Sequence, residues 1–263
     1  MNGLAESAAN PTGVKLQRTA QITVPISVYV VDLDAAGPAL EAVEQTTPRL
    51  SPDQVARFDH STQARGFEDA RRWQAAHIAL RLALERATGP ALRGVPYEIE
   101  PGGRPRISRA LGLPSVPHFS LAHAGAVALI GISQIGPVGV DIEVPRPVAV
   151  SAERRQRMEL AARQLAPGAA LPDAPDARFL QAWVRLEAVA KATGLGIGRI
   201  LTEAGVVGPV PHHDHAMSEW RGAVRDLDAG EGRFAAISAA ELPQILVVQA
   251  FPDTETVLAN FAG

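Results

Sequence analysis

The chain has 263 residues, a formal net charge of −3 and a hydrophobic content of 46%, which is typical of a globular protein. It has no cysteine, which excludes disulfides, thiolate metal sites and cysteine nucleophiles. The near-neutral charge gives no global indication of a nucleic-acid or membrane partner. No apolar run reaches the length of a membrane span, and residues 1–20 lack the apolar stretch of a signal peptide. We therefore expect a disordered leader at 1–20 and a cytoplasmic protein.

Hydrophobic periodicity and turn residues predict both strands and helices in the first half. The expected elements are a strand at 22–33, helices at 37–46, 51–59 and 69–87, a short strand at 97–100, and strands at 116–121 and 127–133. The helix at 69–87 is the clearest of these, with an apolar stripe that begins at Trp73.

The second half repeats this mixture after a turn at Gly136 and Pro137. The expected elements are a strand at 138–143, helices at 151–165 and 177–193 separated by a loop, and strands at 235–238, 245–250 and 257–258. This order indicates an α+β protein, not a regular βαβ alternation. We predict an N-terminal α+β half at 21–137 and a C-terminal α+β half at 138–263.

Two carboxylates lie on one face of the strand at 138–143. Valine and isoleucine alternate there with Gly139, Asp141 and Glu143, so both acids point the same way. Two such charges ~4 Å apart repel by about 4 kcal/mol at an effective dielectric near 20. A proton, a cationic side chain or a metal ion would neutralise them. The alternative is a solvated strand face on which the carboxylates are splayed apart.

Trp183, Glu187 and Lys191 are spaced four residues apart and share one side of the predicted helix at 177–193. Taken alone, Glu187 and Lys191 are an ordinary i,i+4 pair worth only ~0.3 kcal/mol. Combined with the strand, they could place three carboxylates and one ammonium around a single point. That arrangement suits a divalent cation on a diphosphate.

These segments, with four others, resemble the 4′-phosphopantetheinyl transferases of the surfactin-synthetase-activating (Sfp) type. The family pattern G-[IV]-D-[IL]-E is followed some forty residues later by W-x-x-K-E-[AS]-x-x-K. The matching segments, which span roughly residues 25–205, are GVDIE at 139–143, WVRLEAVAK at 183–191, FSLAHAG at 119–125, Gly103-Arg104-Pro105, EDARR at 68–72 and SPDQVAR at 51–57. Each motif is weak alone, but together in the right order they are a fairly specific signal.

The resemblance implies two similar halves packed about a pseudo-two-fold, with the active site between them. It implies transfer of 4′-phosphopantetheine from coenzyme A to a serine of an acyl or peptidyl carrier protein, and a fold that can work as a monomer. By resemblance, Mg²⁺ would be held by Asp141, Glu143 and Glu187. The catalytic residues would be Glu187, as the base, and Lys191. The residues implied to bind coenzyme A are Arg57, Arg72, Arg104, His123 and Lys191.

The chain departs from the family at four positions in these motifs. Leu186 replaces a lysine, Ala122 and Ala124 replace small hydroxylated residues, and Gln54 stands where the family often has another lysine. We expect Arg185 to supply the missing charge, or the enzyme to work with less electrostatic help. On that expectation, Leu186→Lys keeps or raises turnover.

Two other functions remain open at this point. A protein with this site could bind coenzyme A or a carrier without turnover, or it could be a metal-dependent diphosphate hydrolase that uses water in place of serine. Three histidines at 212–215 match no common metal-ligand spacing and are interpreted as an exposed loop. The glycines at 194–198 follow a helix and are interpreted as its end, not as a dinucleotide fingerprint.

Overall fold

The computed structural model describes residues 25–208 and 222–261, without the side chains of 61–65. The predicted leader at 1–20 and the histidine cluster at 212–215 lie outside the described residues. Within the described part of the chain, no helix is both long enough and apolar enough to cross a bilayer.

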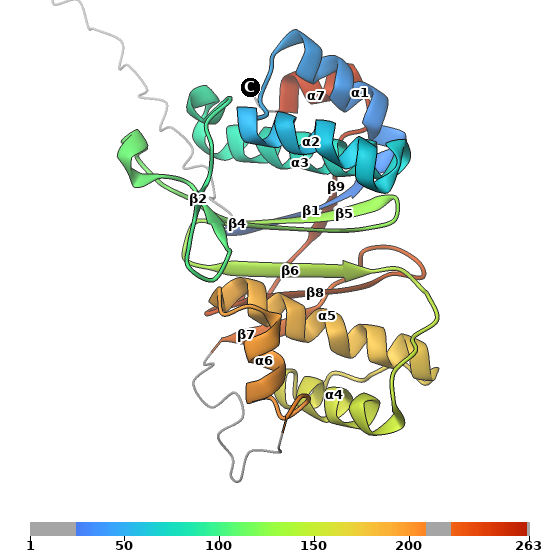
Figure 1. Cartoon of the computed structure of the whole chain (residues 1–263). Helices are drawn as coiled ribbons and strands as arrows, with labels where there is room; N and C mark the ends of the chain where they lie inside the picture. Colours follow the sequence, from blue (N-terminus) through green and yellow to red (C-terminus); the bar gives the residue numbers. More distant parts are fainter. Residues whose placement is uncertain (1–24, 209–221, 262–263) are drawn as a thin grey trace, which may run out of the picture.

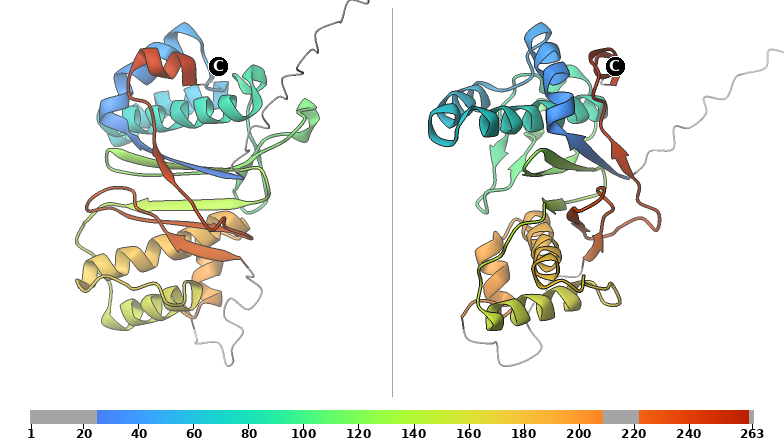
Figure 2. Two further views of the ribbon diagram at one scale, coloured as in Figure 1. Left: turned by 180° about the vertical axis from the view of Figure 1, so that it is seen from behind. Right: turned by 90° about the vertical axis from the view of Figure 1, so that its right-hand side faces the viewer.

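Four layers make up the molecule, in the order helices, sheet, sheet, helices (Figures 1 and 2). The upper sheet has the strand order β4-β5-β1-β9 and consists of β1 (Ile26–Asp32), β4 (His118–Ala124), β5 (Val127–Ser133) and β9 (Val248–Ala250). The helices above it are α1 (Leu33–Thr46), α2 (Pro52–Arg65), α3 (Phe67–Thr88) and α7 (Glu255–Phe261). A hairpin of β2 (Glu98–Ile99) and β3 (Pro105–Arg106) projects from this half, with one-turn 3₁₀ helices η1 (Pro90–Leu92) and η2 (Arg109–Leu111) on either side of it in the chain.

The lower sheet is antiparallel, with the strand order β6-β8-β7. Its strands are β6 (Val138–Glu143), β7 (Ala223–Asp226) and β8 (Phe234–Ala239), and the helices beneath it are α4 (Ala152–Leu165), α5 (Pro175–Thr193) and α6 (Ile197–Glu203). The predicted α+β class is confirmed.

Successive side chains of a strand point to opposite faces of the sheet, and this divides the core into layers. On β1, Tyr29 and Val31 pack against the upper helices, whereas Ile26 and Val28 face the other sheet. The inward side chains of β6 meet them there, so a continuous apolar layer lies between the two sheets. Burial of this layer is the main stabilising contribution that holds the halves together.

The C-terminal segment differs from the prediction. It returns to the upper half, where β9 pairs in parallel with β1, and Figure 2 shows this red segment crossing between the halves. The strand predicted at 257–258 is wrong, because those residues lie in α7, whose Leu258 is fully buried against the upper helices. Residues 197–203, for which no element was predicted, form α6. The two halves are therefore not the two consecutive segments of the predicted division.

Strand β6 packs on helix α5 at backbone distance. The inward-facing residues of β6 contact the upper sheet, so its other face, with Gly139 and Asp141, is turned to α5. A Cβ atom at Gly139 would lie 2.0 Å from the carbonyl oxygen of Ala188 and 2.5 Å from the amide nitrogen of Ala192. Only glycine permits this approach, which places Asp141 next to the last turns of α5.

Replacement of Gly139 by alanine should therefore separate β6 from α5. We expect Gly139→Ala to lower the free energy of unfolding by about 3 kcal/mol, because backbone atoms cannot yield as a flexible side chain can. The matched control is Gly198→Ala in α6, where an added Cβ meets nothing within 4 Å. This control should be neutral or stabilising by up to ~1 kcal/mol. Chemical denaturation of both variants tests the contact, and equal stability would contradict it.

A buried carboxylate anchors the C-terminal end of α3. Glu85 accepts a 2.7 Å hydrogen bond from Arg49 Nε and also pairs with Arg93. Burial opposes its ionisation, but the bonds from Arg93 and Arg49 outweigh burial and hold the pKa of Glu85 below its usual range. One turn earlier on α3, Arg81 donates to the side chain of Gln54 at the start of α2. These two contacts fix the chain between α1 and α2 on α3.

Because the pKa of Glu85 is lowered on folding, its contribution to stability is present above the unfolded value of 4.5 and is lost as the pH falls through the folded value. Glu85→Gln leaves the buried Arg49 without its carboxylate and should cost about 3 kcal/mol at pH 7. Unfolding measured from pH 7 to pH 3 should show a smaller acid-induced loss in the variant than in the wild type. An identical pH profile would mean that Glu85 is not the titrating group.

Candidate functional site

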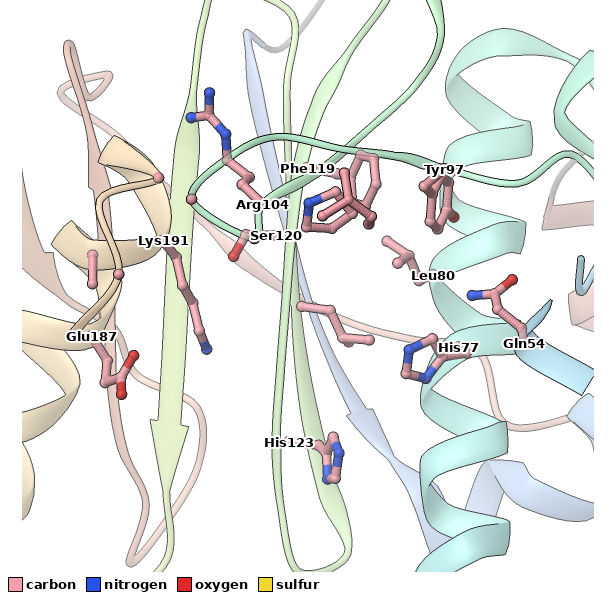
Figure 3. A pocket seen from close by; sticks show the side chains of 18 of the residues that line it. Gln54, His77, Leu80, Tyr97, Arg104, Phe119, Ser120, His123, Glu187 and Lys191 are labelled. Carbon is pink, nitrogen blue, oxygen red and sulfur yellow. The ribbon is translucent and has the colours of Figure 1, made fainter. Parts of the chain in front are cut away.

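A cavity of about 820 Å³ lies between the two halves. Its walls come from α2, α3, the segment around the β2–β3 hairpin, β4, and the last turns of α5 (Figure 3). The lining residues on which the argument depends are Gln54, Arg57, Trp73, His77, Tyr97, Arg104, Ser120, His123, Glu187 and Lys191. Its volume suits a ligand of drug-like or cofactor size.

Helix α5 presents Glu187 and Lys191 to one end of the cavity (Figure 3). Lys191 Nζ donates to Asp141 Oδ1 at 2.7 Å and to the carbonyl oxygen of Val140 at 3.1 Å. The helix ends two residues after Lys191 at Thr193, and Gly194 adopts a left-handed conformation with φ of 70°. Glu187 and Lys191 therefore have the predicted i,i+4 spacing on α5. The ammonium group of Lys191, however, forms its ion pair with Asp141 of β6.

Burial raises the pKa of Asp141, and its pair with Lys191 only partly offsets that effect. Burial also raises the pKa of Glu187, and the negative charge of Asp141 adds to the rise. Two carboxyl groups from different elements therefore repel each other, and one of them, Glu187, lines the cavity. Such a pair favours any cation that comes between them.

Glu143 is held by a different cation. Arg146 donates to both of its carboxylate oxygens, at 3.2 Å from Nε and 3.0 Å from Nη2. Across 25–208 and 222–261, no three His, Cys, Asp or Glu side chains are grouped closely enough to hold a metal ion. With Lys191 on Asp141 and Arg146 on Glu143, side-chain cations neutralise the acids in this arrangement. The metal-ligand roles of Asp141, Glu143 and Glu187 stay predictions.

The structure brings together three of the four other residues expected to bind coenzyme A. Arg57, Arg104 and His123 line the cavity, and His123 belongs to β4 instead of the expected loop. Arg104 is already engaged, since it donates to Ala192 O at 2.7 Å and to Glu100 at 2.8 Å. Arg72 is not part of the lining and forms a two-pronged ion pair with Asp34. Their roles toward a ligand stay predictions.

The expectation that Arg185 supplies the missing charge is wrong, whereas a site that works with less electrostatic help stays a prediction. Leu186 is fully buried in an apolar cluster formed by α4, α5 and α6 and does not point at the cavity. Arg185 is also fully buried and pairs with Asp226 at 2.6 Å, so its charge is used inside the lower half. Each residue advances about 100° around a helix, which turns both side chains away from the face of Glu187.

This burial changes the expected outcome of Leu186→Lys. A lysine at this position would place an ammonium group among buried apolar side chains. We expect a loss of at least about 3 kcal/mol in stability, with any loss of turnover following from unfolding. Leu186→Met, which conserves volume, should cost less than about 1.5 kcal/mol. A folded, fully stable Leu186→Lys protein would contradict this placement.

Several cavity residues were not identified as site residues from the sequence. Trp73 was interpreted as part of a core stripe, and His77, Tyr97 and Ser120 were not singled out. Trp73 and His77 are four residues apart on α3, which was the available signal for a shared face. Ser120 accepts a hydrogen bond from the Val140 amide at 3.1 Å and so ties β4 to the carboxylate strand.

The part of the chain that carries Asp141, Glu143 and Glu187 is similar to known proteins. Residues 137–221 match the family model described as the 4′-phosphopantetheinyl transferase superfamily. A Synechocystis protein named "Putative 4′-phosphopantetheinyl transferase slr0495" is 29% identical over 154 residues, which cover 56% of this chain and 58% of that protein. The 4′-phosphopantetheinyl transferase psf-1 of Bacillus pumilus is 28% identical over 159 residues, which cover 60% of this chain and 64% of psf-1.

These matches support the 4′-phosphopantetheinyl transferase superfamily for this chain. The matched range contains β6 and α5, and hence Asp141, Glu143, Glu187 and Lys191. The chain spans less than two thirds of the length of these relatives. The superfamily match and the geometry thus meet at the same end of the cavity.

Proposed function

We propose that this protein transfers 4′-phosphopantetheine from coenzyme A to a serine hydroxyl of an acyl or peptidyl carrier protein, with Mg²⁺ as cofactor. The observation that carries the proposal is the position of Glu187 and Lys191 beside Asp141, at one end of a cavity between the halves. The family match over 137–221 covers the same residues. The Sfp-type subfamily is part of this proposal and rests on the sequence motifs.

The carboxylates fit a magnesium ion by their chemistry. Asp141, Glu143 and Glu187 offer only oxygen donors, which are the ligands that Mg²⁺ prefers. The pKa of Glu187 is raised first by burial and then by the negative charge of Asp141. This rise indicates that too little positive charge surrounds the Glu187 carboxyl group. When bound, the ion would neutralise and orient the diphosphate of the substrate. Lys191 and Arg146 would then be released from Asp141 and Glu143.

The residues of the chain have distinct roles in this reaction. Glu187, on a rigid helix at the cavity wall, would accept the proton of the carrier serine, and its raised pKa suits a base. The serine oxygen forms a bond to phosphorus as the phosphoanhydride bond breaks. Adenosine 3′,5′-bisphosphate leaves, and Lys191 would stabilise the developing negative charge. Arg57, Arg104 and His123 would hold the phosphates from the other walls.

The test is to incubate the protein with coenzyme A, Mg²⁺ and an apo carrier protein and to determine the mass of the carrier. A gain of one phosphopantetheine is the expected result. Cleavage of coenzyme A without a change in the carrier would favour a diphosphate hydrolase. Binding of coenzyme A without either reaction would favour a passive binding protein. Either of the last two outcomes overturns the proposed transfer.

The role of Asp141 gives a sharper prediction. Asp141→Asn keeps the size of the side chain and removes one of the repelling charges, so the fold should remain intact. Transfer should nevertheless fall about 100-fold or more, because charge stabilisation of the diphosphate is lost. Glu153→Gln, on the exposed side of α4, is the matched acid-to-amide control and should leave the rate unchanged. Equal rates for the Asp141 variant and this control would remove Asp141 from the mechanism.

A further inference from the structure

On the wall of the cavity formed by α2 and α3, opposite Glu187 and Lys191, several uncharged groups lie beside the charged Asp53 and Arg57. Gln54, His77, Leu80 and Tyr97 lie there (Figure 3), with Trp73 as a further lining residue. The resembled family often has a lysine at the position of Gln54, so this chain presents an uncharged amide where the family often has a cation. The side chains present require a different kind of ligand group.

The orientation of the Gln54 amide is set by its neighbours. Its Oε1 atom accepts hydrogen bonds from Arg81 Nε at 3.0 Å and Nη2 at 2.7 Å, and also from Ser51. A guanidinium can only donate, so this atom must be the oxygen and the other must be the nitrogen. Gln54 is only 6% exposed, and Figure 3 shows its amide nitrogen turned toward the cavity. Within the described part of the chain, the hydrogen bonds of the Gln54 side chain are all made by its oxygen.

The protonation of His77 is set in the same way. Its Nδ1 atom lies 2.8 Å from the carbonyl oxygen of Trp73, which can only accept, so Nδ1 carries the hydrogen. Burial lowers the pKa of His77 to about 4, and the positive charges of His123, Arg57 and Arg81 act in the same direction. The ring is therefore neutral at pH 7, and its Nε2 atom is a hydrogen-bond acceptor.

These two groups occupy neighbouring positions on one surface. Trp73, His77 and Arg81 are spaced four residues apart and share a face of α3, and Arg81 holds the Gln54 amide over that face. The indole of Trp73 packs on the imidazole with ring centroids 3.9 Å apart and planes 30° from parallel. The result is one donor and one acceptor beside a flat aromatic surface.

We propose that Gln54 and His77 form a donor–acceptor pair that recognises an uncharged, planar group of the ligand, one that presents an acceptor next to a donor. A phosphate oxygen would be repelled by the lone pair of His77 Nε2, whereas an amide or a nucleobase edge satisfies both partners. In coenzyme A, which enters here through the proposed function, this chemistry occurs in the adenine and in the pantetheine amides. Gln54 and His77 are thus specificity-determining residues of the cavity.

Calorimetric titration with coenzyme A and two point variants tests the pair. His77→Phe keeps a ring against Trp73 and removes the acceptor. Gln54→Glu keeps an oxygen for Arg81 and replaces the donor by a second oxygen. Each variant should bind coenzyme A about tenfold more weakly than the wild type. The matched control, Val55→Glu, adds the same charge at an exposed neighbour outside the lining and should bind within twofold of wild type. Thermal unfolding checks that all three variants are folded.

Titration with two uncharged fragments, adenosine and pantetheine, identifies the group that is recognised. Because neither fragment carries a phosphate, the negative charge added by Gln54→Glu cannot weaken their binding by repulsion. Loss of adenosine binding in the variants assigns the base, and loss of pantetheine binding assigns an amide. Either result supports the proposal. Unchanged binding of both fragments, or coenzyme A affinity within twofold of wild type in both folded variants, overturns it, as does a wild-type protein that binds none of the three.

The outcome is separable from that of the proposed transfer. If both variants bind more weakly as expected but the protein modifies no carrier, the donor–acceptor pair is supported and the proposed transfer fails. A protein that modifies a carrier while both variants bind normally would lose the subsite alone.

Discussion

The structure depends most on the close contact between β6 and α5. Gly139 lies against the carbonyl of Ala188 and the amide of Ala192, at a distance that no side chain allows. The other face of β6 packs against the upper sheet through its apolar residues. Strand β6 is therefore held from both sides. Because its position is set by backbone contact, Asp141 and Lys191 meet at 2.7 Å although they are fifty residues apart.

This arrangement places charged groups where water is scarce. Burial raises the pKa of both Asp141 and Glu187. The negative charge of Asp141 adds to the rise at Glu187, and that of Glu143 adds to the rise at Asp141. Lys191 compensates for one of these charges and Arg146 compensates for Glu143. A site of this kind is poised to exchange its side-chain cations for those of a ligand complex, since burial strengthens every ionic interaction within it.

The two ends of the cavity follow different chemistry. Glu187 and Lys191 from the lower half line one end, and Gln54, His77 and Tyr97 line the other, together with the charged Asp53 and Arg57 of α2. The buried guanidinium of Arg81 connects α2 with α3, and it also stacks on the Tyr97 ring at 4.0 Å. It acts on the cavity through the amide that it orients and does not itself line the wall. An extended ligand with a charged centre and an uncharged end fits such a division.

The sequence by itself determined the elements that rest on local patterns. The periods of β6 and α5 placed Asp141 and Glu143 on one strand face and Glu187 and Lys191 on one helix face, because these repeats follow from backbone geometry alone. The motif order also pointed to the superfamily that the comparisons support. The metal ligands and phosphate contacts stay predictions, since the described residues show side-chain cations on two of the acids.

Only the tertiary structure decided which neighbour each side chain meets. Leu186 and Arg185 stand beside Glu187 in the chain, yet packing of α4 and α6 against α5 buries both away from the cavity. The C-terminal segment was assigned to the lower half, but its pairing with β1 depends on an open sheet edge far away in the sequence. Likewise, Gln54 acquires a fixed orientation only through Arg81. Such contacts join residues that are distant in sequence, and no local period records them.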